Sequence, residues 1–322
     1  MGNSPPEFGV QQRTAAGAAT ELTPAQSGTE QPVSACDKNV NPQVTFHSTL
    51  VADRKNPMKT IDPDWRPAWS TTRDEQKFAF VQNLVEKQLA PRYSDNADWL
   101  NFRNFLETNE EFAYSSHFYR YLNTFGLLTR QLGELRGKVI VETGGASPLS
   151  VFLSGFNQCV ATEADLRSDF DVDSGFADLI ISLEVIEHLK DQPEKQFSEV
   201  VLFMESGVRS YSAEVKRIAK PDADIILTTP NPCSYAAIAK AVEHSPAYVF
   251  RQHVREYSKA ELLRIFDGLT PIYYESVFNF FLLSEAGLRE EWVKNFSQMG
   301  WDTEDRGDDH FFHFRNAESL TH

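Results

Sequence analysis

The stretch from Lys138 to Asn231 alternates short apolar runs with longer segments of mixed polarity. The runs are VIVETGGAS, CVATEAD, DLIISLEVIEHL and DIILTTPNP. Strands that are apolar almost throughout, and that are separated by crossover segments, are typical of a parallel sheet covered on both faces. The carboxyl ends of such strands meet at one edge of the sheet, where open α/β folds bind their ligands. The stretch therefore predicts a doubly wound α/β fold with a ligand site at that edge.

Patterns on either side complete the predicted architecture. Before the sheet, three apolar stripes at helical spacing predict an N-terminal helical layer. The first stripe begins near Thr72 and is ended by Pro91. The other two run through Trp99, Phe102 and Leu106, and through Phe118, Leu122, Phe125 and Leu132. After the sheet, PIYYESVFNFF and HFFHFRNA predict a C-terminal antiparallel strand pair, and Leu288, Trp292 and Phe296 predict an amphipathic helix between the two strands.

Aromatic side chains of the helical layer have two interpretations. The residues concerned are Phe112, Tyr114, Phe118, Tyr119 and Tyr121. Aromatic residues at helical spacing usually belong to a core, and we favour that interpretation here. The alternative is that they line a substrate pocket.

The first forty residues differ from the rest of the chain. They are rich in Pro, Gly, Ser, Thr, Ala and Gln, and they contain hardly any large apolar residues. Such a segment cannot bury enough apolar surface to offset the entropy lost on ordering, so we predict a flexible tail. We divide the chain into a disordered tail over residues 1–45, a helical cap over residues 46–135 and a ligand-binding sheet domain over residues 136–318.

Composition excludes several classes of protein. A net charge of −15 without a local basic cluster argues against a nucleic-acid partner. No apolar run approaches the roughly 20 residues that span a bilayer, and the N-terminus lacks a signal core, so we expect a cytoplasmic protein without membrane insertion. The three cysteines lie far apart and suggest neither disulfides nor a zinc site. We interpret the acidic run from Asp302 to Asp309 as a solvated loop rather than a cation site.

Residues 136–318 resemble a class I S-adenosylmethionine-dependent methyltransferase of the ubiquinone-biosynthesis-like, small-molecule branch. The resemblance rests on the order and spacing of five segments. The first two are Glu142-Thr143-Gly144-Gly145-Ala146, in place of the acid-x-Gly-x-Gly loop, and Glu163 at the end of the second strand. The other three are LEVIEHL from Leu183 to Leu189, TTPNP from Thr228 to Pro232, and HVREYS with ELL from His253 to Leu263. It implies a Rossmann-like sheet and S-adenosylmethionine as the cofactor.

The resemblance also implies which residues bind that cofactor. A glycine turn lets the backbone approach a ligand closely, so Gly144, Gly145 and the adjoining Ala146 are expected at its methionine part. A carboxylate at the end of the next strand accepts ribose hydroxyl protons, and Glu163 fits this role, with Asp165 as its competitor.

Glu142 is expected to anchor either the loop or the cofactor's ammonium group; the alternative is a purely structural acceptor for loop N–H groups. Asp169, or Phe170, is assigned to the adenine, and Leu183 completes the cofactor set.

The chain departs from the family pattern in three places. Ala146 and Pro148 stand where further glycines are usual, and proline removes a backbone donor from the turn. About a dozen residues separate Glu163 from Asp178, which is too few for a helix and a strand, so we predict a short loop or a stub of strand. The segment from Gln192 to Lys220 is longer than usual and is expected to add a helix over the site.

Histidine is the natural base for methyl transfer to a hydroxyl at neutral pH. His188 and His253 are the candidates, because both are predicted at the carboxyl edge. The alternatives are a structural hydrogen bond after the fourth strand for His188 and a packed core residue for His253. Glu184 is the third catalytic candidate.

A metal site is a further hypothesis. If LEVIEHL is helical, then Glu184, Glu187 and His188 share one helical face, and together with His253 they suit Mg or Mn. This resembles the metal site of small-RNA 3'-terminal 2'-O-methyltransferases. Because similar segments occur in metal-free enzymes of this fold, and because the acidic surface disfavours RNA, we predict no metal.

The sequence therefore predicts methyl transfer from S-adenosylmethionine to an oxygen, with nitrogen as the second choice, of a small molecule or a sugar-containing precursor. The sugar rests on resemblance alone. Two alternatives stay open: a degenerate, non-catalytic binding module, motivated by Ala146, Pro148 and the short loop, and a metal-dependent RNA 3'-end 2'-O-methyltransferase. A dehydrogenase fits the glycine turn but neither LEVIEHL nor TTPNP.

Overall fold

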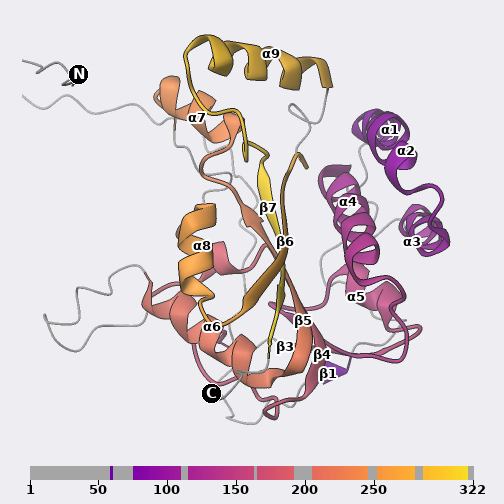
Figure 1. Cartoon of the computed structure of the whole chain (residues 1–322). Helices are drawn as coiled ribbons and strands as arrows, with labels where there is room; N and C mark the ends of the chain where they lie inside the picture. The colour runs from indigo at the N-terminus through magenta and orange to yellow at the C-terminus, as the bar shows by residue number, and fades with distance from the viewer. Residues whose placement is uncertain are drawn as a thin grey trace, which may run out of the picture. The chain divides into compact units, whose positions relative to one another are not determined.

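The computed structural model describes residues 59–60, 75–109, 115–162, 165–191, 205–245, 252–279 and 286–317 (Figure 1). All of them belong to one compact unit that spans Asp53–His322. The predicted tail, Thr72, Phe112, Tyr114, Glu163 and the beginning of the long segment after Gln192 lie outside the described residues. No helix within the described ranges is both long enough and apolar enough to cross a membrane.

A seven-stranded sheet forms the centre of this unit. Its strands lie in the order β1-β3-β2-β4-β5-β7-β6. They are β1 Lys59–Thr60, β2 Val139–Thr143, β3 Gln158–Thr162, β4 Ala177–Leu183, β5 Ala219–Pro230, β6 Thr270–Val277 and β7 Asp309–Arg315. Strands β2 to β5 run parallel, whereas β7 lies antiparallel between β5 and β6. The predicted mostly parallel sheet with a C-terminal antiparallel pair is confirmed.

Each central strand is buried on both faces, and alternate side chains enter two separate cores. Ile140 and Leu179 belong to the core under the N-terminal helices, whereas Val141 and Ile180, one residue further along, belong to the opposite core. This period of two is what a pleated strand imposes. Figure 1 shows α4 and α5 on one face of the sheet and α6 and α8 on the other, which is the doubly wound arrangement.

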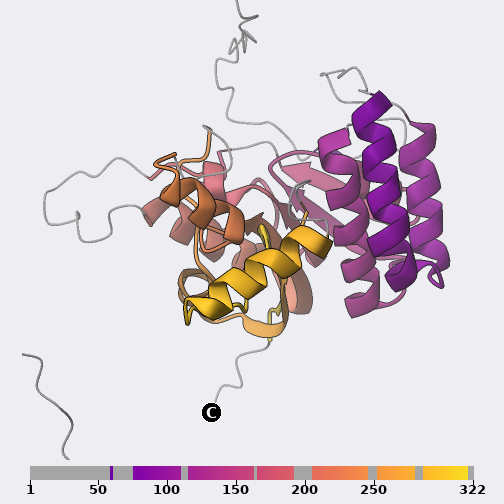
Figure 2. The same ribbon diagram turned by 90° about the horizontal axis from the view of Figure 1, so that it is seen from above.

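The N-terminal helices form a layer of their own, seen in indigo and magenta in Figure 2. They are α1 Glu75–Leu84, α2 Ala90–Tyr93, α3 Ala97–Thr108 and α4 Ser115–Leu132. Their apolar faces join the core under the sheet through Phe102, Phe118 and Phe125. The core interpretation of Phe118 fits this burial, since its side chain is fully enclosed. Tyr119 is also almost fully enclosed, but it lines a cavity as well, as the alternative interpretation allows.

Pro91 does not end the first helix, contrary to the prediction. A π-helical turn over Val85–Leu89 precedes it, and the amide of Ala90 donates to the carbonyl of Val85. The chain then continues as α2, in which Pro91 occupies the first turn. The π-helical turn shifts the hydrogen-bond register immediately before Pro91, so the chain stays helical although Pro91 has no amide to donate.

Five further α-helices occur among the described residues of the sheet domain. They are α5 Pro148–Leu153, α6 Ser206–Ile218, α7 Tyr235–Val242, α8 Lys259–Ile265 and α9 Ala286–Gln298. Side chains of Ser147, Ser234 and Ser258 accept amide hydrogen bonds at the starts of α5, α7 and α8. The predicted C-terminal amphipathic helix is α9, and its Phe296 is buried against Tyr235.

The segment after β3 has the predicted short form. The described residues 165–176 contain turns but neither helix nor strand. The place beside β3 is taken instead by β1, which pairs antiparallel with Val160 and Ala161. A strand from the N-terminal part of the chain thus covers the edge that the short loop leaves open.

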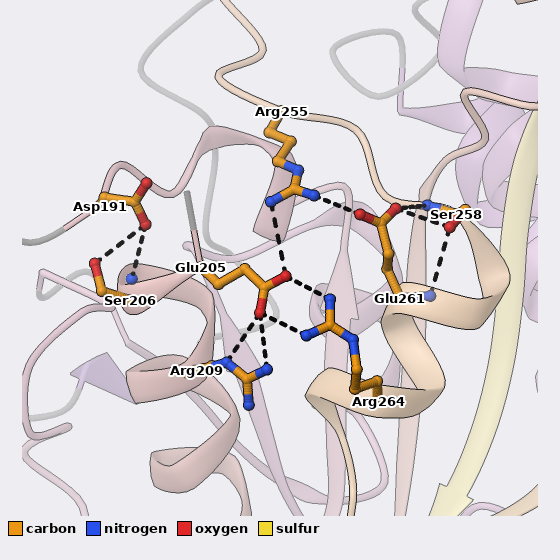
Figure 3. A network of polar contacts seen from close by, with 9 residues as sticks. Asp191, Glu205, Ser206, Arg209, Arg255, Ser258, Glu261 and Arg264 are labelled. Carbon is orange, nitrogen blue, oxygen red and sulfur yellow. Dashed lines mark hydrogen bonds and ion pairs between the residues drawn. The ribbon is translucent and has the colours of Figure 1, made fainter. Parts of the chain in front are cut away.

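An ion-pair network links α6, α8 and the loop before α8, as Figure 3 shows. Glu205, just before α6, accepts hydrogen bonds from Arg209 at 2.8 Å and from Arg264 of α8 at 2.9 Å. Arg255 bridges Glu205, at 4.0 Å, and Glu261 of α8. The network therefore fixes the segment that carries His253.

Candidate functional site

The carboxyl ends of the central strands meet at one edge, as predicted. Strand pairing sets Thr143 beside Ser182, Leu183 beside Thr228 and Pro230 beside Asp309. The glycine turn after β2 and the LEVIEHL segment after β4 are consequently neighbours. This edge gathers most of the residues selected from the sequence.

Gly144 and Gly145 both adopt positive φ, at 87° and 105°. Residues with a Cβ avoid this region, so the turn requires glycine. A Cβ on Gly144 would lie 2.8 Å from Val185, whereas one on Gly145 would meet no atom within 4 Å. Both amides donate to the carbonyl of Thr162 at 3.2 Å, so they tie β2 to the end of β3. The open space at the Cα atom of Gly145 therefore leaves room for a ligand to come close to the backbone. The amides of Gly144 and Gly145 are already hydrogen-bonded to Thr162.

Glu142 is buried beneath this turn. Its Oε2 accepts the amide of Ser147 at 2.7 Å and the hydroxyl of Ser150. Burial raises the pKa of Glu142 to about 7, although these hydrogen bonds oppose the rise. The observed partners are those of the structural alternative, in which the carboxyl group holds the loop.

Pro148 and Ala146 are accommodated without loss to the turn. Pro148 is the first residue of α5, after the Ser147 cap, where its missing amide costs no hydrogen bond. Ala146 is half-buried and packs against the core under the N-terminal helices. Pro148 therefore costs the chain no internal hydrogen bond, although it offers no amide of its own to a ligand.

The loop after β3 separates its candidate residues. Asp165 is exposed and pairs with Arg167 at 2.8 Å, and Asp169 is also exposed. Phe170 is buried, with its ring centroid 5.8 Å from that of Tyr211. Glu163 lies outside the described residues, and the hydroxyl of the neighbouring Thr162 is buried without a hydrogen-bond partner among the described groups.

LEVIEHL is not one helix, so the predicted shared face of Glu184, Glu187 and His188 is wrong. Leu183 is half-buried and ends β4, and Glu184 still donates its amide to Thr228 at 2.9 Å, in continuation of the sheet. Glu184 then adopts φ of 56°, which reverses the chain before a single 3₁₀ turn over Ile186–His188. Its side chain turns to Arg120 of α4, at 3.4 Å.

His188 and His253 are brought together, as expected for two groups at this edge. Their ring centroids lie 4.9 Å apart at an interplanar angle of 85°. Nδ1 of His253 lies 2.7 Å from Oε1 of Glu256, and His188 Nε2 lies 3.7 Å from Glu187. Burial, and then the neighbouring His253, lower the pKa of His188. The two imidazoles are therefore in contact, and Glu256 orients the ring of His253.

Three of the four hypothetical metal ligands are close together. One ligand atom each from Glu187, His188 and His253 lie within 4.8 Å of one another. Oε1 of Glu187 is buried and has no hydrogen-bond partner among the described residues, while its Oε2 accepts from Thr229 at 2.9 Å. A carboxylate with two imidazoles fits a divalent cation. Glu184 does not join them, because it pairs with Arg120.

A buried charged cluster, missed by the sequence analysis, lies next to the histidines. Arg120 interacts with Glu184, Glu187 and Asp309, and all three carboxylates are largely or fully enclosed. Burial, followed by the charge of Glu184, raises the pKa values of Glu187 and Asp309 well above their ordinary range. Asp309 begins β7 and is fully buried, so the prediction of a solvated loop is wrong at this position.

Hydrogen bonds extend this cluster into the helical layer. Asn279 donates to Asp309 at 2.7 Å and accepts from Asn123 of α4 at 2.9 Å. Asn123 in turn accepts from the Tyr93 hydroxyl at 3.3 Å. No local motif marks these residues, because they are joined only by the packing of α4 against the sheet edge.

Comparisons with known proteins give weak similarities. No protein-family model and no curated protein matches the chain. Among solved structures, it is similar to a SAM-dependent methyltransferase from Thermotoga maritima described as a possible histamine N-methyltransferase, with 15% identity over 68% of this chain and 99% of that chain and a TM-score of 0.41.

A SAM-dependent methyltransferase from Archaeoglobus fulgidus has 14% identity over 62% of this chain and 97% of that chain, with a TM-score of 0.37. A putative sarcosine dimethylglycine methyltransferase from Galdieria sulphuraria has 12% identity over 66% and 90%, also with a TM-score of 0.37. Similarity this weak carries no argument about activity, and the class of fold rests on the strand order.

Proposed function

We propose that this protein is an S-adenosylmethionine-dependent methyltransferase that acts on an oxygen, or in second place a nitrogen, of a small molecule or sugar-containing precursor. The observation that carries the proposal is the juxtaposition of two features at the carboxyl edge. A glycine turn with an open Cα face lies after β2, and at the same edge His188, which follows β4, meets His253 of the segment before α8. The first suits a nucleotide-type ligand and the second suits proton transfer.

The cofactor is proposed to lie across the ends of β2 and β3. Gly145 offers space for close approach, and the buried Thr162 hydroxyl lacks a partner among the described residues. Glu163 is proposed to accept the ribose hydroxyl protons, with Asp169 and Leu183 beside the adenine. When bound, the sulfonium supplies an electrophilic methyl group, so the chain has mainly to position the acceptor in line.

His253 is the proposed base. Its Nδ1 faces Glu256 at 2.7 Å, so a proton held at Nδ1 leaves Nε2 as the basic nitrogen. His188 lies edge-to-face with this ring and is the second candidate. Glu184 is assigned a supporting role, because its carboxylate holds Arg120 beside the site.

Isothermal titration tests the class. We expect S-adenosylmethionine and S-adenosylhomocysteine to bind the wild-type protein with micromolar affinity and NAD not to bind. Glu163→Ala should abolish binding and keep the circular dichroism spectrum. Asp165→Ala tests the competing carboxylate, and we expect it to keep the affinity, since Asp165 is exposed and pairs with Arg167. Absence of binding in a folded wild-type protein would instead support the non-catalytic binding module.

A further inference from the structure

A cavity of about 310 Å³ lies between the N-terminal helices and the end of β6. Residues of the π-helical turn, α2, α4, β6 and α9 line it. Its volume is at the lower end of the range of small-molecule pockets. The polar part of its wall includes Arg92, Tyr119, Asn123, Glu275 and Arg289.

The cavity lies at the same edge of the sheet as the histidines. Strands β5 and β6 both pair antiparallel with β7, so they run in the same direction and both end at this edge. Val277 at the end of β6 pairs with Asp309 of the charged cluster. Asn123, in the cavity wall, is connected to Asp309 through Asn279 by hydrogen bonds of 2.9 and 2.7 Å. An acceptor bound in the cavity would thus lie next to the proposed catalytic groups.

The arginines of the cavity differ in their partners. Arg92 pairs with Glu275 at 3.0 Å, and Glu275 also pairs with Arg130 at 3.0 Å. No carboxylate among the described residues lies within ion-pair distance of Arg289, and its Nε is buried without a hydrogen-bond partner there. Glu275, the one acidic residue in the cavity wall, therefore pairs with Arg92 and Arg130 and not with Arg289.

Arg289 is also held in a defined orientation. Its guanidinium carbon lies 3.9 Å from the centroid of the Phe278 ring. Burial has the largest effect on the pKa of Arg289 and lowers it. Smaller electrostatic effects on this pKa come from Tyr119, Asp308, Arg92 and Glu275. A guanidinium is planar and presents its N–H donors as a fork, which matches the geometry of an oxyanion.

We propose that this cavity binds an oxyanion, carboxylate or phosphate, carried by the methyl acceptor, and that Arg289 is the residue that recognises it. The Tyr119 hydroxyl, which donates to Gln88 at 3.0 Å, and the Asn123 side chain complete the polar wall. The role of the oxyanion as part of an acceptor rests on the proposed function. Binding of the oxyanion itself does not.

The first test measures thermal unfolding of the full-length protein in sodium phosphate and, separately, sodium acetate, against sodium chloride at equal ionic strength. We expect at least one of the two oxyanions to raise Tm saturably, and the one that does so identifies the group. Arg289→Gln should weaken that effect at least about tenfold, the loss expected for a charge-assisted hydrogen bond. Arg136→Gln is the matched control, because Arg136 also lies over an aromatic ring, Phe156 at 4.4 Å, but outside the cavity.

Two results would overturn the inference: no oxyanion effect in the wild type, or equal effects in the two glutamine variants. If Arg289→Gln does not fold, Tyr119→Phe replaces it, and an unchanged oxyanion affinity in that variant also counts against the site. Titration with S-adenosylmethionine is independent of Arg289. Cofactor binding without an oxyanion effect would leave the proposed function standing and remove only this inference.

Discussion

His253 lies between a carboxylate and a second imidazole, as its proposed role of general base requires. Its Nδ1 is 2.7 Å from Glu256, and its ring lies edge-to-face with His188. General-base catalysis is worth about 10²- to 10⁴-fold in rate. We therefore expect His253→Ala to lower kcat by that factor and to leave the affinity for S-adenosylmethionine unchanged, as measured by single-turnover kinetics and titration.

Controls separate the base from a packing residue or a metal ligand. His244→Ala alters an exposed histidine and should keep full activity. Glu256→Gln retains a side chain of the same shape and should cost less than His253→Ala. Activity should survive exhaustive chelation. Activity that is lost on chelation and restored by Mn²⁺ would reassign His253 and Glu187 as ligands.

The sequence located part of this site and missed the rest for physical reasons. The ends of neighbouring parallel strands must meet, so the place of His188 at this edge followed from its position just after β4. Arg120 and Asn279 come from α4 and from the segment after β6, and only tertiary packing joins them to Asp309. Glu184 was misplaced because its amide continues the sheet and its φ of 56° breaks the expected helix.

At the scale of elements, Glu205 connects α6 to α8. Hydrogen bonds from Arg264, and then those from Arg209, lower the pKa of Glu205 from 4.5 to about 2. A lowered carboxyl pKa stabilises the native state above pH 4.5, and this stabilisation is lost as the pH falls towards 2. We expect Glu205→Gln to lower the free energy of unfolding by about 1 kcal/mol at pH 7. Urea unfolding measures it.

The difference between Glu205→Gln and the wild type should become smaller at pH 3.5 than at pH 7, because the carboxyl group of Glu205 is then largely protonated in the unfolded state but still ionised in the native state. Glu134→Gln serves as the control, since the side chain of Glu134 is 75% exposed. It should change stability little at either pH. A difference that stays constant with pH would mean that Glu205 acts through packing rather than through its charge.

Elements with a strong period were predictable, and their irregular parts were not. The strands β2 to β5 and the helices α3 and α4 follow from apolar spacing, which burial on one or two faces imposes. Pro91 misled the prediction because the π-helical turn before it resets the hydrogen-bond register. The two residues of β1 carry no pattern, and their place follows only from the open edge of β3.

At the scale of the whole molecule, the edge strand β1 gives the final prediction. Residues 1–40 have a composition that predicts no stable structure, so removing them should leave Tm within about 2 °C of the full-length value. A chain that begins at residue 61 also lacks β1, and the backbone beside Val160 and Ala161 then loses its antiparallel partner. Because an uncovered edge both loses hydrogen bonds and invites association, we expect this shorter chain to have a lower Tm and to aggregate. Calorimetry and light scattering on the two truncated proteins measure these effects. An equal Tm and equal light scattering of the two truncated proteins would show that β1 contributes nothing to the sheet. If the protein that begins at residue 41 had a Tm clearly below that of the full-length protein, residues 1–40 would have a stabilising role.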